Sequence, residues 1–259
     1  MNIKIESSSN PTFKQVKKLQ SRSGRAKSNQ YLAEGVRAVA DAVRNGADIE
    51  HIILCEGSHL PCEAPGIRVY ELSKSLFDEL KLTVNSQGVL AVINYALDDA
   101  SSMDTSSVDI IVYLDCVTDP GNMGTIIRSC DALGADAIIL SKGCVDIFNP
   151  KVVRSTMASL FNVPIFIDSS SSDTLKRLSD EGFLIAGTFP REAEPICDTD
   201  FSGKIVIVMG NEANGISKEV EALCTKRVTI PMKGRAESLN VATALTVVLY
   251  EITRKRGDT

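Results

Sequence analysis

Continuous apolar runs in the second part of the chain constrain its fold more than any other feature. Six of them, bounded by Gly, Pro or Asp, read DIIVYLD, DAIILS, VPIFI, FLIAGT, KIVIVMG and VTIPM. Strands that are buried on both faces need apolar side chains at every position, which is typical of a parallel sheet covered by helices on both sides. Helical patterns lie between the runs, as in GTIIRSCDALG, KVVRSTMASLF, TLKRLSDEG and SKEVEALCTKR. We therefore expect residues 108–259 to form an α/β domain with a parallel sheet.

The first part of the chain alternates shorter strands and helices. The basic helical segment FKQVKKLQS precedes a strand QYLAEG and a helix VRAVADAVRNG, and three more strands (IEHIILCE, IRVYEL, GVLAVINY) and a helix SKSLFDEL follow. This order predicts a small α/β domain over residues 1–97. In LDDASSMDTSS, Asp and Ser crowd together without apolar periodicity, so residues 98–107 are predicted to form an exposed linker.

The net charge of −5 is unevenly distributed. Residues 1–44 hold nine basic and three acidic side chains, an excess of six positive charges. A local basic patch, rather than the total charge, is what attracts the phosphates of RNA, although a Lys-rich helix face is often only solvated. The candidate RNA-binding residues are Lys14, Lys17, Lys18, Arg22, Arg25 and Lys27.

Several classes of protein are disfavoured by what the sequence contains. No apolar run approaches the ~18 residues of a membrane span, and MNIKIESSSN has no apolar signal core. The seven cysteines are scattered without a C-x-x-C pair, and there are two histidines, a composition that predicts no metal site. We expect a cytoplasmic protein without membrane or metal partners.

Three strand ends in the second domain carry unusual residues at the edge where parallel sheets bind ligands. The first is VYLDCVTDPGNMGTIIRSCDALGA. We expect a helix that begins near Asn122 as its N-cap, with the Arg128 side chain leaning back toward the strand ends beside Gly124. A cap followed by a surface arginine would give the same pattern.

The other two strand ends follow later in the chain. In IVIVMGNEANGISKEV, a strand ends at Gly210, and Glu212 lies between Gly210 and Gly215, where a ligand can approach the backbone closely. In TIPMKGRAESLNVATAL, Ser238 is the expected N-cap of the last helix, which leaves Asn240 without an explanation, because a buried Asn needs a partner. A plain turn is the alternative for the loop around Glu212, and an N-capped helix after a tight loop is the alternative for the loop around Ser238.

In this order the three loops resemble the signature motifs of the SpoU (TrmH-like) RNA 2′-O-ribose methyltransferases of the SPOUT superfamily. The matches are N-x-G-x-x-x-R over residues 122–128, M-G-N-E-x-x-G over 209–215 and I-P-M-x-G-x-x-E-S-L-N-V over 230–241. The family's third motif usually continues with a serine, where this chain has Ala242. The basic helix with Arg25 and the stretch YLAEGVRAVADAV also resemble the family's N-terminal substrate-binding module.

This resemblance implies a fold, a cofactor and an assembly. The parallel sheet would carry a C-terminal trefoil knot, and the small α/β domain before it would bind RNA. The loops of the second and third motifs would hold S-adenosylmethionine, and a homodimer would give the almost wholly apolar last helix, SLNVATALTVVLYEITRK, a partner surface. The implied cofactor-binding residues are Gly210, Asn211, Ile230, Met232, Ser238 and Leu239.

The resemblance also implies catalytic roles for Arg128, Asn122, Glu212 and Asn240. A free-base arginine is a poor fit, because the pKa of arginine exceeds ~12. We expect the Arg128 guanidinium to stabilise the developing alkoxide and to bind the adjacent phosphate. Asn122 would orient Arg128 or the ribose, while Glu212 and Asn240 would fix the pocket and the arginine by hydrogen bonds.

Two other classes of protein were weighed. A nicotinamide-dependent enzyme needs G-x-G-x-x-G after a strand, and the sequence has none. A non-catalytic RNA-binding protein with the same fold could lose Arg128 or the third motif, and both are present. The two-domain layout favours ribosomal RNA as the substrate, with the same reaction on transfer RNA as the alternative; housekeeping and antibiotic-resistance methylation both stay open.

Overall fold

The computed structural model describes residues 2–257, which separate into two compact units. Unit 1 contains the chain up to Ala96 together with a later segment, Asp146–Asn162, which we call the inserted segment. Unit 2 contains Leu97–Val145 and the chain from Val163 onward. The chain therefore passes from one unit to the other three times, whereas the sequence predicted a single passage.

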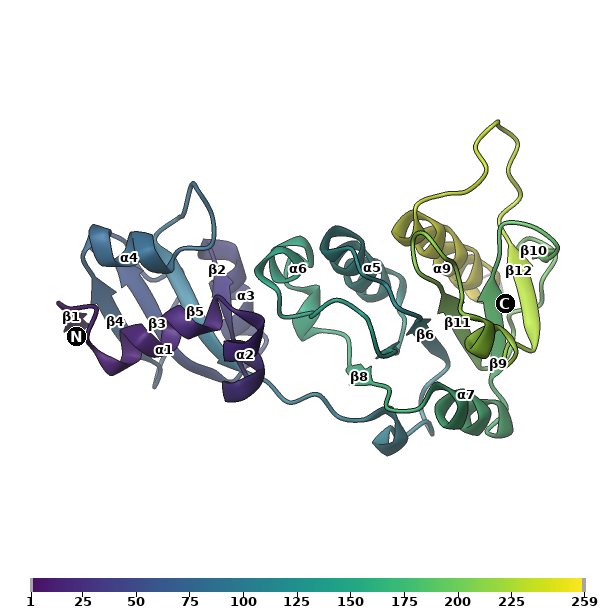
Figure 1. Ribbon diagram of the computed structural model, residues 1–259, viewed down its shortest axis with the longest axis horizontal. Coiled ribbons are helices and arrows are strands. Elements are labelled where there is room, and N and C mark those ends of the chain that lie inside the picture. The colour runs from purple at the N-terminus through teal and green to yellow at the C-terminus, as the bar shows by residue number, and fades with distance from the viewer. Residues whose placement is uncertain (1, 258–259) are drawn as a thin grey trace. The chain divides into compact units, whose positions relative to one another are not determined.

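Unit 1 is built on a mixed sheet with the strand order β1-β4-β3-β5-β2 (Figure 1). Strands β1, β4 and β3 are parallel, and β5 is antiparallel to both β3 and β2. Apolar residues of helices α1 and α4, among them Phe13 and Phe77, form a core with Ile53 and Leu90 of the sheet. The strands are β1 (Ile3–Ile5), β2 (Gln30–Glu34), β3 (Ile49–Cys55), β4 (Arg68–Leu72) and β5 (Val89–Asn94). The helices are α1 (Pro11–Leu19), α2 (Arg22–Ser28), α3 (Val36–Arg44), α4 (Lys74–Leu80), α6 (Pro150–Ser155) and the short 3₁₀ helix η2 (Ser159–Phe161).

Four of these strands and helices α3 and α4 lie where the sequence predicted them, and β1 and α2 were not predicted. The basic helix expected over residues 13–21 ends at Leu19, because Ser21 begins a second helix. The Ser21 side chain accepts a hydrogen bond from Gly24 N at 3.1 Å, which is the geometry of an N-cap.

Unit 2 contains an entirely parallel sheet in the order β10-β12-β9-β11-β6-β7-β8, which confirms the prediction from the apolar runs (Figure 1). Helices α5 and α9 cover one side of this sheet, and α7 and α8 pack on the other, against Ile111, Tyr113 and Val208. The strands are β6 (Ile110–Leu114), β7 (Ala137–Leu140), β8 (Ile165–Ile167), β9 (Leu184–Thr188), β10 (Glu194–Pro195), β11 (Ile205–Met209) and β12 (Lys226–Thr229). The helices are η1 (Ala100–Ser102), α5 (Pro120–Leu133), α7 (Ser171–Asp180), α8 (Lys218–Glu221) and α9 (Val241–Gly257).

The segment 98–107 is not the exposed linker that the sequence predicted. Ala100 and Met103 are buried in the core of unit 2, and the carbonyl of Thr105 accepts a hydrogen bond from Lys204 Nζ at 2.8 Å. Two apolar side chains in a run rich in Ser and Asp are a weak sequence signal, yet they are enough to fix this segment to the unit.

The apolar last helix finds most of its partner surface within its own chain. Leu245, Val248, Leu249 and Ile252 of α9 are at most 1% exposed, and α9 packs along α5. Ser129 of α5 also shares a hydrogen bond of 2.7 Å with Thr246 of α9. Burial of these side chains therefore does not require a second subunit.

The third motif lies in a long loop between β12 and α9, the yellow-green loop that runs out from β12 and returns to α9 in Figure 1. Residues 231–240 are exposed along the whole loop. The trefoil knot that the family resemblance implies stays a prediction. Within residues 2–257, no helix is both long and apolar enough to cross a membrane.

Candidate functional site

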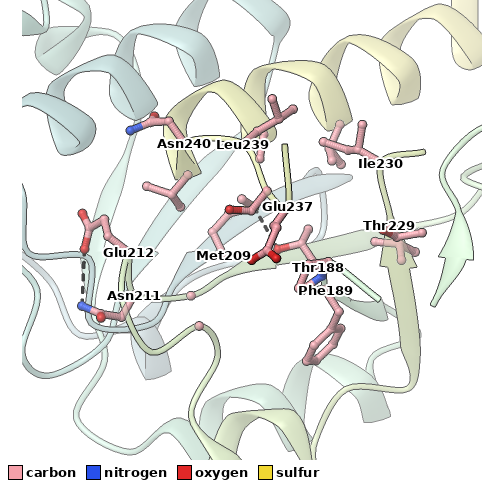
Figure 2. Close-up of a pocket in the computed structure, with 18 of the residues that line it drawn as sticks. Thr188, Phe189, Met209, Asn211, Glu212, Thr229, Ile230, Glu237, Leu239 and Asn240 are labelled. Carbon is pink, nitrogen blue, oxygen red and sulfur yellow. Dashed lines mark hydrogen bonds between the residues drawn. The ribbon is translucent and has the colours of Figure 1, made fainter. Parts of the chain in front are cut away.

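The strand ends of unit 2 enclose a cleft of about 670 Å³. Because the strands are parallel, the carboxyl ends of β6, β9, β11 and β12 lie at one edge of the sheet, so the loops that follow them meet there. Figure 2 shows Asn240 and Leu239, which precede α9, across the cleft from Asn211 and Glu212, which follow β11. The predicted site residues that line the cleft are Asn122, Gly210, Asn211, Glu212, Ile230, Met232, Ser238, Leu239 and Asn240.

The start of helix α5 differs by three residues from the prediction. Its N-cap is Asp119, whose side chain accepts a hydrogen bond from Asn122 N at 2.8 Å, and Pro120 occupies the first helical position. Asn122 is therefore not the cap. Because its side chain is not needed for capping, the Asn122 amide is available for bonds across the cleft.

Three polar side chains from three separate loops form one hydrogen-bonded chain. Asn122 Nδ2 donates to Glu212 Oε1 at 3.0 Å, and Asn240 Nδ2 donates to Asn122 Oδ1 at 2.8 Å. These bonds join the N-terminus of α5, the loop after β11 and the N-terminus of α9. The three motifs are thus held together by the side chains that define them.

Glu212 is the acceptor at which most of these bonds converge. Besides Asn122, it accepts from Thr118 N at 3.3 Å, Thr118 Oγ1 at 3.2 Å, Asp119 N at 3.1 Å and Asn211 Nδ2 at 3.3 Å. Partial burial by itself raises the pKa of Glu212, but the bonds donated by Asn122 and by main-chain N–H groups outweigh it, and the pKa lies below its ordinary value. Glu212 is therefore an ionised acceptor that positions its neighbours, and it is a poor general base.

The loop after β11 is closed by its own main chain. Asn211 and Gly215 exchange two backbone hydrogen bonds, both of 2.9 Å. A Cβ atom on Gly210 would lie 2.2 Å from the carbonyl carbon of Gly215, so only glycine fits there. Asn211 Nδ2 also donates to the carbonyl of Cys116 at 2.8 Å, which ties this loop to the end of β6.

Several residues that build this edge of the sheet were not predicted as site residues from the sequence. Buried Asp115 accepts a hydrogen bond from Ser217 N at 2.7 Å and so anchors the far end of the loop after β11. Phe189, which follows β9, lines the cleft and carries the Arg227 guanidinium 3.7 Å from its ring centre. The signal that could have indicated both is their position at the carboxyl end of a buried strand.

Asn240, rather than Ser238, caps the last helix. Its side-chain oxygen accepts hydrogen bonds from Ala242 N at 3.0 Å and Thr243 N at 3.3 Å, while its amide donates to Asn122. This double use explains the asparagine that the sequence analysis could not place. Ser238 lies in the exposed loop before the helix and lines the cleft.

The lining of the cleft combines an apolar floor with negative charge. Met209, Val228 and Val248 are at most 2% exposed and form part of the floor. Asp119 and Glu212 line the same cleft, as does Glu237, and its described lining includes no Lys, Arg or His. An apolar body with a positive charge fits this surface, which is the chemistry of an adenosyl sulfonium. A dinucleotide, whose phosphates are anionic, fits it poorly.

Arg128 lies outside the cleft. It is exposed on α5, and among residues 2–257 no hydrogen bond or ion pair reaches it. Among the described residues Asn122, Glu212 and Asn240 bond to one another and not to Arg128, so the part of the expectation in which they orient Arg128 by hydrogen bonds is wrong for this structure, and that Asn122 orients the ribose stays a prediction.

The basic surface of unit 1 also differs from the prediction in one residue. Arg25 is 4% exposed, and its guanidinium donates to Asp146 Oδ2 at 3.0 and 2.6 Å. A buried and paired arginine cannot bind an RNA phosphate, so Arg25 is removed from the candidate RNA-binding residues. Lys17 pairs with Glu79 at 2.9 Å but stays exposed. Lys14, Lys18, Arg22 and Lys27 are exposed.

Within the described part of the chain, no group of His, Cys, Asp and Glu side chains is arranged to hold a metal ion.

Comparison with known proteins finds a matching family model for each of the two parts of the chain. Residues 109–250 match the model of the SpoU rRNA Methylase family, and residues 10–91 match that of an MRM3-like substrate binding domain. The chain is 30% identical to RlmP, a 23S rRNA guanosine 2′-O-methyltransferase of Bacillus subtilis, over 96% of this chain and 98% of that protein.

Two solved structures are similar over almost the whole chain. The SpoU methyltransferase AviRb of Streptomyces viridochromogenes, in complex with AdoMet (S-adenosylmethionine), has a TM-score of 0.85 and 29% identity, with 96% of this chain and all of that chain covered. An AdoMet-bound rRNA methyltransferase of Sinorhizobium meliloti also has a TM-score of 0.85 and 29% identity, with 97% of both chains covered. From the three ordered motifs, the parallel sheet and these matches, we conclude that the chain belongs to the SpoU rRNA methylase family.

Proposed function

We propose that this protein transfers a methyl group from S-adenosylmethionine to a ribose 2′-hydroxyl of ribosomal RNA. The main support for the proposal is the cleft in which the three motifs converge, because its floor is apolar and its polar lining is acidic. Its residues fit a cationic methyl donor, and the relatives named above act on 23S rRNA or were solved with that donor.

Some residues of the cleft would bind the cofactor, and others hold the surrounding helix ends in position. S-adenosylmethionine supplies an activated methyl group when it is bound. Gly210, Ile230 and Leu239 would hold it through their main chains and apolar surfaces, and Met232 and Ser238 would close the cleft from the exposed loop. The Glu212–Asn122–Asn240 chain keeps the ends of α5 and α9 at fixed positions, and fixed positions supply much of the rate of a transfer between two bound groups.

The charge that develops on the ribose oxygen needs a cation, and the described lining of the cleft offers none. Arg128 is the family's candidate for this role, and its exposed guanidinium, which pairs with none of the described residues, can bind an oxygen and a phosphate of RNA. Because Arg128 lies outside the cleft of its own chain, it would act where a second protomer or the bound RNA brings the two together.

A homodimer is part of the proposal. On α9 the outward side chains include Val247 and Tyr250, which are 36% and 59% exposed, and α5, which packs along α9, exposes Arg128. Exposed apolar side chains on α9 and an exposed arginine on α5, the helix packed along it, are groups that a second copy could cover. A cytoplasmic location also belongs to the proposal and is supported by seven cysteines that form no disulfide.

The test is methyl transfer to purified RNA. We expect radioactive methyl from S-adenosylmethionine to enter large-subunit ribosomal RNA from cells that lack the gene, at a ribose that then resists alkaline cleavage. Transfer to transfer RNA instead would favour that alternative. Binding of S-adenosylmethionine by calorimetry without any transfer would favour a non-catalytic RNA-binding protein, and absence of binding would refute the proposal.

A further inference from the structure

The inserted segment is anchored in unit 1 by a buried ion pair. Arg25 Nε and Nη2 donate to Asp146 Oδ2, and Arg25 Nη1 donates to the carbonyls of Leu19 and Gln20 at 3.0 and 3.2 Å. Only a planar guanidinium can make these four bonds together. Arg25 therefore fixes the first residue of the inserted segment to the end of α1.

Aromatic packing fixes the segment two residues later. The Phe148 ring is stacked on Tyr95 with 3.8 Å between ring centres, and on Tyr31 with 4.7 Å. Phe148 is 5% exposed and Tyr31 is 3% exposed, so this stack belongs to the core of unit 1. Together with the ion pair, it gives helix α6 a fixed place on unit 1.

One side of helix α6 is buried in unit 1, and another side is exposed. Val152 and Val153 are buried, and α6 packs on the edge strand β2. Lys151 and Arg154 are exposed one helical turn apart, and within residues 2–257 neither forms an ion pair. Met157, three residues further on, is 44% exposed. These three exposed residues, two cations on α6 and one flexible apolar side chain in the turn that follows it, are together called the α6 row.

The turn after α6 holds an unfavourable backbone conformation. Met157 and Ala158 have φ values of +50° and +78°, in the left-handed region that favours glycine. Each such non-glycine residue costs about 1–2 kcal/mol. At the half-exposed Met157, burial of the side chain does not offset this conformational free energy. Strain of this kind is often retained where a side chain must be presented to a ligand.

We propose that the α6 row is a second RNA-contact surface, an inference that rests on the proposed function. Lys151 and Arg154 bind phosphates, Met157 packs on an unstacked base, and Arg25 is the positioning residue that holds the row in place. Helix α2, which carries Arg22 and Lys27, also packs on β2. Two helices that carry exposed cations therefore pack on the same edge strand of unit 1.

The first experiment removes the two cations of the α6 row and compares the result with the loss of two cations elsewhere on the surface. The variant Lys151→Ala/Arg154→Ala is tested beside Arg68→Ala/Lys176→Ala, whose side chains are exposed and form no ion pair among the described residues. Binding of the full chain to a short fluorescein-labelled single-stranded RNA of mixed sequence is measured against salt concentration. Loss of two phosphate contacts makes the slope of log K against log salt less steep by about 1.4.

We expect this change for the α6 variant and a wild-type slope for the control, with the same affinity of both for S-adenosylmethionine by calorimetry. Equal slopes for the two variants would overturn the inference while leaving the proposed function intact. A wild-type protein that neither binds nor methylates RNA would overturn both.

The second experiment separates Met157 from the strain that it carries. Met157→Gly and Ala158→Gly each relieve one left-handed residue, but only the first removes the apolar side chain. We expect neither variant to melt below the wild type, and Met157→Gly alone to bind the RNA probe more weakly, by about five-fold, because the apolar surface of the side chain is no longer buried against a base. Wild-type affinity of Met157→Gly would remove Met157 from the surface.

The third experiment tests the positioning role of Arg25. Arg25→Lys keeps the charge but loses the planar fork, so the α6 row should lose its fixed position while the protein stays folded. We expect the salt slope to fall as in Lys151→Ala/Arg154→Ala, with no further change when the two are combined. A folded Arg25→Lys variant with the wild-type slope would show that Arg25 is structural only.

Discussion

Glu212→Gln tests the reasoning about the cleft most directly. The substitution keeps the shape of the side chain, removes its charge and turns one acceptor oxygen into an N–H₂ donor. Glu212 Oε1 faces two donors, on Asp119 and Asn122, and Oε2 faces three, two of them on Thr118 and one on Asn211. Because all five groups donate, glutamine cannot satisfy both sets in either orientation.

The magnitude follows from the bonds that are lost. If the glutamine oxygen takes the place of Oε1, the glutamine N–H₂ group takes the place of Oε2. It then faces two other donors, Thr118 N and Asn211 Nδ2, and both of these hydrogen bonds are lost. The Thr118 hydroxyl can rotate and accept, so its bond is kept. A hydrogen bond to a charged group contributes about 1.5–3 kcal/mol when buried, and about 1 kcal/mol at a solvent-exposed residue such as Glu212. Two lost bonds destabilise the wild-type arrangement of the cleft by about 2 kcal/mol, and if the transition state must restore that arrangement, kcat/KM falls by about 30-fold.

The assay is kcat/KM for methyl transfer, with calorimetry for S-adenosylmethionine affinity. Glu219→Gln is the matched control, because Glu219 is an exposed carboxylate in the same unit for which the described residues provide no hydrogen-bond partner. Asn122→Ala should add little to Glu212→Gln, since the two share one bond. If Glu212→Gln matched Glu219→Gln in both rate and affinity, the hydrogen-bonded chain would have no role in the reaction.

Further predictions address the rest of the molecule. Arg128→Ala should lower the rate by about 10²–10³ without changing cofactor affinity, and Arg128→Lys should be nearly as inactive; near-normal activity of the alanine variant would make Arg128 a bystander. Gly210→Ala should weaken cofactor binding because its Cβ would strike the main chain of Gly215, whereas Gly234→Ala, whose Cβ meets nothing within 4 Å, should not. Burial lowers the pKa of His51, so the folded state disfavours its protonation; the free energy of unfolding should decline as pH falls below the unfolded value of about 6.5, and His51→Phe should flatten that decline in urea titrations. Light scattering should give a mass of about twice 27.9 kDa, and a fully active monomer would exclude the homodimer.

The sequence predicted the architecture of unit 2 well because its signals are local. Unbroken apolar runs identify parallel strands, and parallel strands bring their following loops to one edge. Three short motifs far apart in the chain could therefore be placed around one cleft before any coordinates were known. The fine position of helix starts was harder. Asp119 and Asn122 are both good caps, and the deciding signal was Pro120, which favours the first helical position and so points to Asp119.

Contacts between distant segments could not be predicted in the same way. Arg25 lies in a Lys-rich stretch and has the composition of an RNA-binding residue, but its partner Asp146 is 121 residues away. The same holds for α9, whose apolar sides fitted either burial in the core or contact with a second subunit, and α5 covers most of them. Composition describes what a side chain can do, and only the packing decides which partner it meets.

The distribution of charge gives the proposed reaction a physical constraint. A cationic methyl donor and a polyanionic RNA need surfaces of opposite sign, and the chain separates them: carboxylates line the cleft in unit 2, and the exposed basic residues of α1, α2 and α6 lie on unit 1. The carboxylates that favour the donor repel RNA phosphates, so a ribose can enter only if its neighbouring phosphates are neutralised outside the cleft. Arg128 carries an unpaired charge on the helix whose N-terminus forms the cleft wall, which suits it to that task. An arginine outside the cleft can neutralise such a phosphate, whereas stabilising the charge on the ribose oxygen requires that a second protomer or the bound RNA bring Arg128 to the cleft.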